Sequence, residues 1–117
     1  MSDQTTTVAD LRAMMKKFVD ERDWSQFHNP KNLSMAIAIE AAELMEHFQW
    51  IEGHRAGDIR DAADEFQLVR EELSDILAFA LSFANALDID ISDALQEKMV
   101  KNAKKYPADE FRGRFRR

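Results

Sequence analysis

Apolar residues recur every three or four positions along most of this chain, and few residues interrupt the pattern. The 117 residues include only three glycines and two prolines, and no segment alternates apolar and polar residues long enough to suggest a β-sheet. Apolar positions with this spacing share one face of a helix. The sequence therefore predicts an all-α fold, with a single domain over residues 1–117 whose ends, about 1–6 and 113–117, are flexible.

Four helices are predicted, and together they would form a four-helix core bundle. They cover about 7–21, 33–52, 59–87 and a last stretch that ends near residue 106. Asn32 is the expected N-cap of the second helix, because Pro30 disfavours helix in the residue before it. Asp90 or Ser92 is the expected cap of the fourth helix, and the third helix has an irregular first turn.

The third predicted helix is apolar on two sides. Its first stripe contains Phe66, Val69, Leu73, Ile76, Leu77, Ala80 and Ala84, and its second contains Leu68, Phe79, Phe83 and Ala86. A surface helix of a monomer needs only one such stripe. The second stripe predicts burial against another subunit, in a dimer or a dimer of dimers.

Charge and composition limit the classes of binding partner that the chain is expected to have. With 16 basic and 22 acidic residues the formal charge is −6, which argues against general nucleic-acid binding. The basic end, "RGRFRR", is interpreted as a solvated terminus. No apolar run reaches the roughly 20 residues of a membrane span, and the N-terminus lacks signal-peptide features, so a soluble cytoplasmic protein is expected.

Two acid pairs interrupt the apolar faces of the second and third helices. Glu40 and Glu43 are three residues apart, as are Glu72 and Asp75, so each pair lies on one helical face. Four like charges in an apolar setting are unfavourable without a cation. Carboxylates suit Mg²⁺, with Mn²⁺ as an alternative, and Mg²⁺ commonly binds substrate phosphates as well.

Three longer segments carry a family resemblance that spans about residues 18–114. They are "ERDWSQFHNPKNLSMAIAIEAAELMEHFQW", "EELSDIL" and "KMVKNAKKYP" followed by "RGR". The chain resembles the MazG-like all-α nucleoside triphosphate pyrophosphohydrolases, in their dCTP pyrophosphatase-like branch. That resemblance implies Mg²⁺-dependent cleavage between the α and β phosphates, giving a monophosphate and pyrophosphate.

The resemblance also implies roles for individual residues. All four acids would bind the metal, and Glu40 or Glu43 would also orient or activate water. The phosphate-binding candidates are Lys98, Asn102 and Arg112, and the base- or sugar-binding candidates are Trp24, Trp50, His28 and Tyr106. The favoured substrate is dCTP or a modified cytosine nucleotide. Ile39 and Ala42 stand where relatives often have glycine, and Phe79 stands where tyrosine is common.

Two other interpretations remain open from sequence. A noncatalytic helical interaction module would use the acids to bind a basic partner and would expose all four to solvent. A carboxylate di-iron bundle would need Glu-x-x-His motifs. The residues three after Glu40 and Glu72 are both acids, and His47 follows Glu43 by four, so the di-iron class is disfavoured.

Overall fold

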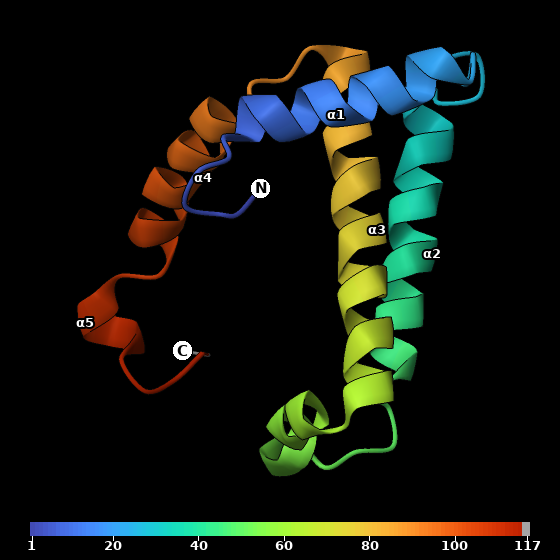
Figure 1. Ribbon diagram of the computed structural model, residues 1–117. Coiled ribbons are helices and arrows are strands. Elements are labelled where there is room, and N and C mark those ends of the chain that lie inside the picture. The colour runs from blue at the N-terminus through green and yellow to red at the C-terminus, as the bar shows by residue number, and fades with distance from the viewer. Residues whose placement is uncertain (116–117) are drawn as a thin grey trace. The chain divides into compact units, whose positions relative to one another are not determined.

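The computed structural model describes residues 1–115, and its regular elements are all helices, which confirms the predicted all-α class (Figure 1). They are α1 (Val8–Glu21), α2 (Pro30–Glu46), the 3₁₀ helix η1 (Gly53–Asp61), α3 (Ala63–Leu87), α4 (Ile91–Lys105) and α5 (Ala108–Phe111). Arg116 and Arg117 lie outside the described residues, so the predicted flexible end falls partly beyond them. Among the helices described, none is both long and apolar enough to cross a membrane.

The chain divides into two compact units, and each is described by itself. The first, Met1–Leu87, contains α1, α2, η1 and α3. Within it α2 and α3 run antiparallel side by side, with η1 between them in the chain, and α1 packs on α3 (Figure 1). The second unit begins at Asp88 and contains α4 and α5. The ring of Tyr106, the C-cap of α4, meets the ring of Phe111 in α5 edge to face, with centroids 5.2 Å apart. A single domain over the whole chain stays a prediction.

Capping side chains explain where the helices begin. Thr7 and Asp10 form a reciprocal capping box at the start of α1, which satisfies two backbone N–H groups that the first turn leaves free. Asp90, rather than Ser92, caps α4 by accepting from the Asp93 N–H. The chain therefore uses short polar side chains at both helix starts, as the sequence suggests.

The predicted boundaries of α2 are wrong by several residues at both ends. Asn29 is the N-cap and accepts a hydrogen bond from the Asn32 N–H at 2.9 Å. Pro30 then occupies the first helical position, where its fixed φ is favourable and its missing N–H has no intrahelical partner to lose. The helix ends at Glu46, and the N–H groups of His47 and Phe48 bond to carbonyls three residues back. That change of bonding tightens the final turn and ends the α-helix.

Few side chains of the first unit are fully buried, and part of the α3 surface is exposed to solvent. The buried apolar residues are Val19, Leu33, Leu81 and Ala84. Contrary to the predicted assignment of stripes, Leu73 and Leu77 of the first stripe are exposed, whereas Phe79 and Phe83 of the second are half-buried within this chain. Packing with α1 and α2 selects different residues from those that helical periodicity alone favours. Leu68 and Ala86 of the second stripe are exposed.

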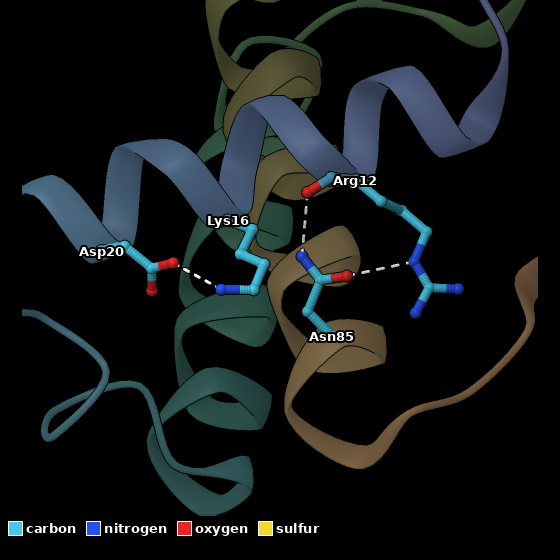
Figure 2. Close-up of polar contacts among 4 residues, drawn as sticks. All are labelled: Arg12, Lys16, Asp20 and Asn85. Carbon is cyan, nitrogen blue, oxygen red and sulfur yellow. Dashed lines mark hydrogen bonds and ion pairs between the residues drawn. The ribbon is translucent and has the colours of Figure 1, made fainter.

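A polar contact joins α1 to the end of α3 (Figure 2). The Arg12 Nε–H donates to Asn85 Oδ1 at 3.0 Å, and Asn85 Nδ2 donates back to the Arg12 carbonyl at 3.0 Å. Both residues are half-buried, where loss of one partner leaves the other poorly solvated. The Lys16–Asp20 ion pair in the same view is on the exposed face of α1 and contributes little to stability.

We expect Asn85→Ala to lower the free energy of unfolding by about 1–3 kcal/mol, because it removes both hydrogen bonds that join the Asn85 side chain to Arg12. Lys16→Gln, on the same helix as Arg12, is the control and should change stability by less than about 0.5 kcal/mol. Urea denaturation followed by circular dichroism measures both. Equal effects from the two substitutions would show that the Arg12–Asn85 contact does not hold α1 on α3.

Candidate metal and nucleotide site

Three of the four predicted acids meet between α2 and α3. Glu40 and Glu43 lie one turn apart on α2, and Glu72 lies on α3. One carboxylate oxygen from each falls within 4.8 Å of the others, and all three side chains are half-buried. The antiparallel packing of α2 on α3 is therefore what brings acids some 30 positions apart in sequence into one cluster.

Two buried oxygens of this cluster have no hydrogen-bond donor. Glu40 Oε2 and Glu72 Oε2 are buried and have no hydrogen-bond partner in this structure. Two carboxylates can hydrogen-bond to one another only if one of them carries a proton. Burial, hydrogen bonding to Glu43 and Glu72, and the negative charge of Glu43 and Asp75 together raise the pKa of Glu40 to about 7. The site therefore favours a positive species, either a proton or a cation.

Asp75 lies at the margin of this cluster. It is exposed and is not among the three acids that approach within 4.8 Å. Its negative charge nevertheless helps to raise the pKa of Glu40, so it acts on the same site electrostatically. The structure brings Glu40, Glu43 and Glu72 together and leaves Asp75 nearby on the solvent side.

A histidine that the sequence interpretation does not include in the site lies beside the cluster. His47 Nε2 is 3.9 Å from Glu72 Oε1, and the side chains are only 23% and 20% exposed. His47 is the C-cap of α2, one turn after Glu43. That spacing places it on the face of Glu43 and is the sequence signal that could have identified it. Its partner on α3 is visible only in the folded structure.

The donor set fits a hard divalent cation. The three clustered acids offer oxygen ligands of the kind that Mg²⁺ and Mn²⁺ prefer. A cation among them would also supply the missing partner for Glu40 Oε2 and Glu72 Oε2. The orphaned buried oxygens, rather than the acid count, are the reason that these residues suit a metal.

Aromatic side chains form a connected row at the other end of this helix pair. Trp24 contacts Phe18 edge to face at 5.6 Å and His28 at 6.0 Å between ring centroids. His28 in turn is 6.2 Å from Phe79 on α3, and its Nδ1 is buried without a hydrogen-bond partner. Two of the predicted base- or sugar-binding residues, Trp24 and His28, are therefore neighbours, with a polar atom available beside an apolar wall.

Trp50 lies far from that row within one chain. It follows the C-terminal end of α2 and is 89% exposed, whereas Trp24 and His28 precede the N-terminal end. A 17-residue helix is roughly 25 Å long. The two tryptophans of one chain are therefore at opposite ends of α2 and do not form one pocket within that chain.

The remaining predicted residues belong to the second unit. Lys98 and Asn102 lie on α4, Tyr106 is its C-cap, and Arg112 is the C-cap of α5. Lys98, Tyr106 and Arg112 are exposed, and Asn102 is half-buried. The spacing of four residues along α4 gives Lys98 and Asn102 a common face. Their role as phosphate ligands stays a prediction.

We expect the metal-free protein to lose stability as the pH rises from about 4.5 to about 7. With the pKa of Glu40 raised from 4.5 to about 7, the folded protein binds more protons than the unfolded chain in that window, so the free energy of unfolding falls with pH. The loss attributable to Glu40 is up to about 3 kcal/mol. Glu40→Gln should flatten this part of the profile and be more stable than wild type at pH 8.

Denaturant unfolding in a chelating buffer from pH 4.5 to 8 measures that profile. Glu46→Gln on the exposed face of α2 is the control and should keep the wild-type slope. A wild-type profile that is flat or rises across the window would contradict the raised pKa.

Sequence comparisons with known proteins match most of this chain to one family. A model of the MazG-like family matches residues 35–115. The chain is 38% identical over 107 residues to dCTP pyrophosphatase 1 of Bos taurus and 38% identical over 102 residues to that of Homo sapiens, covering 92% and 87% of this chain. It spans 63% and 60% of the length of those relatives.

A solved structure supports the same family relationship. The crystal structure of a pyrophosphatase from Archaeoglobus fulgidus is similar with a TM-score of 0.77 and 33% sequence identity, over 92% of this chain and 98% of that one. The family model covers the acid-bearing parts of both α2 and α3 and extends through α4. This chain belongs to the MazG-like family.

Proposed function

We propose that this protein is a cytoplasmic, Mg²⁺-dependent nucleoside triphosphate pyrophosphohydrolase. It cleaves a nucleoside triphosphate between the α and β phosphates and releases a monophosphate and pyrophosphate. The observation that carries the proposal is the cluster of Glu40, Glu43 and Glu72 with its unpartnered buried oxygens. The names of the relatives, dCTP pyrophosphatase 1 and a pyrophosphatase, support the same reaction class.

The acids have two roles in the proposed reaction, which are to bind the metal ion and to orient the attacking water. Glu40, Glu43, Glu72 and Asp75 would hold the ion, which supplies positive charge to the phosphate oxygens when bound. Glu40 or Glu43 would also orient the attacking water and accept its proton.

The two rival interpretations fit the cluster less well. An interaction module would present all four acids to solvent, whereas three of them are half-buried against one another. A di-iron bundle would place histidine ligands among the acids, but the described group of potential ligands consists of three glutamates. Mn²⁺ remains an alternative ion because it accepts the same oxygen ligands.

Trp24 and His28 are the proposed contacts for the base or sugar. An indole ring offers a flat apolar surface on which a base stacks, and the buried His28 Nδ1 needs a hydrogen-bond partner. Tyr106 and Trp50 are further candidates for the same role, and Lys98, Asn102 and Arg112 are proposed for the phosphates. We propose dCTP or a modified cytosine nucleotide as substrate, on the strength of the relatives' name.

Pyrophosphate release from a panel of ribo- and deoxyribonucleoside triphosphates tests the activity. We expect Glu40→Gln and Asp75→Asn each to reduce kcat/KM at least about 100-fold, because each removes charge from the site where the phosphates react. Glu46→Gln and Glu71→Gln carry the same kind of substitution on exposed positions of the same helices and should keep wild-type activity.

Two results would reject the assignment. Wild-type activity in both site variants would move the chemistry elsewhere, and release of orthophosphate and a diphosphate would mean that a different bond breaks. Glu40→Gln is also the variant expected to be more stable at pH 8, so inactivity accompanied by higher stability separates loss of chemistry from loss of fold.

We further propose that the chain works as a homodimer or homotetramer. Leu68, Leu73 and Leu77 leave apolar surface on α3 exposed, and burial of such surface drives association. The separation of Trp24 from Trp50 along α2 supports the same conclusion. Both can line one nucleotide site only if they come from different copies.

A subunit-mixing experiment tests the shared site. Trp24→Ala and Trp50→Ala should each raise KM by about 5-fold or more, through lost stacking. Mixed oligomers of the two variants contain sites with both tryptophans intact, so mixing should restore part of the low-KM activity. Refolding the variants together and apart measures this, with mixed wild-type and Trp24→Ala protein as reference. Absence of restoration would contradict a site shared between copies.

A further inference from the structure

His47 is unusual among the polar side chains near the acid cluster because it is the described basic group paired with one of the clustered acids. Its Nε2 lies 3.9 Å from Glu72 Oε1, and both side chains are about four-fifths buried. The distance is longer than that of a direct hydrogen bond, as contacts at functional sites often are before the ligand is bound. A neutral imidazole can still donate from Nε2, so the contact does not require a charged ring.

The two oxygens of Glu72 have different surroundings. Oε1 lies toward His47, whereas Oε2 is buried and unpartnered, as is Glu40 Oε2. A carboxylate whose first oxygen faces a half-buried donor group has less freedom to rotate, and its second oxygen stays directed into the cluster. Mutation of residues that orient metal ligands in this way commonly lowers metal affinity by about 10–100-fold.

The position of His47 suits this role. It is the C-cap residue of α2, so its backbone is anchored to the same helix as Glu43 and Glu40. The contact to Glu72 therefore joins the end of α2 to the middle of α3, next to the acids that both helices supply. Nothing in the proposed reaction uses the imidazole itself as base, nucleophile or ligand.

We propose that His47 is a positioning residue, which holds Glu72 so that its second oxygen is presented to a divalent cation. This inference rests on the proposed metal-dependent function, and it concerns affinity for the ion rather than the chemical step. Loss of the imidazole weakens metal binding and leaves the acids themselves in place.

Mn²⁺ binding to the nucleotide-free protein, followed by electron paramagnetic resonance at pH 8, is the test. His47→Leu and His47→Phe remove the ring nitrogens, and we expect each to raise the Kd for Mn²⁺ about 10-fold or more. His47→Gln keeps an N–H donor at similar reach and should bind Mn²⁺ more tightly than either apolar variant. The matched control is His54→Leu, because His54 forms an ion pair with Glu52 at 3.5 Å in which both side chains are 76% exposed.

The kinetic readout separates positioning from a structural role. In the pyrophosphate-release assay, His47→Leu should raise the Mg²⁺ concentration needed for half-maximal activity about 10-fold, while kcat at saturating Mg²⁺ stays within about 3-fold of wild type. A merely structural defect would lower kcat at every Mg²⁺ concentration. Circular dichroism of each variant verifies the helical fold, and two apolar variants guard against one that does not fold.

The outcomes distinguish this inference from the proposed function. If wild-type protein binds Mn²⁺ and both apolar variants bind it equally well or better, the positioning role is wrong and the metal site stands. The positioning role is equally contradicted if His47→Gln binds Mn²⁺ as weakly as His47→Leu. If wild-type protein binds no Mn²⁺ either alone or with a nonhydrolysable nucleotide, the proposed function fails, and this inference fails with it.

Discussion

Repulsion among carboxylates held between α2 and α3 is the constraint on which this structure depends. The two helices form the main contact of the first unit, and that contact encloses Glu40, Glu43 and Glu72. Apolar packing on either side keeps the acids together although their charges oppose it. Burial and the neighbouring carboxylates raise the pKa of Glu40 to about 7, so a proton bound there relieves part of this repulsion.

A proton and a divalent metal ion would compete for binding at the Glu40 carboxylate. A proton on Glu40 reduces the repulsion but removes a metal ligand, whereas a divalent cation relieves it and leaves every carboxylate ionised. Under the proposed function, stability and activity are consequently opposed at Glu40, since the neutral side chain that lowers the repulsion would not bind the metal. Such opposition is typical of functional sites, where a residue is retained despite its effect on the fold.

How far the sequence predicts this structure depends on whether a feature is local. The all-α class, the start of α1 and the acid pairs follow from periodicity and capping, which act within a few residues. The predicted first turn of α2 is wrong because Pro30 is the N1 residue of that helix rather than a barrier before it. The exposure of Leu73 and the pairing of His47 with Glu72 depend on tertiary packing, which no local pattern contains.

The geometry of α2 links the proposed active site to the proposed assembly. Its midpoint carries Glu40, its beginning adjoins Trp24 and His28, and Trp50 follows its end. A single copy can therefore offer the acid cluster and one aromatic surface, and the proposed base pocket with two tryptophan walls would need a second copy. Exposed leucines on α3 provide an apolar surface for such a copy to cover. If association completes the pocket, dilution to monomers weakens nucleotide binding before it disturbs the acid cluster, because the three clustered glutamates all belong to one chain.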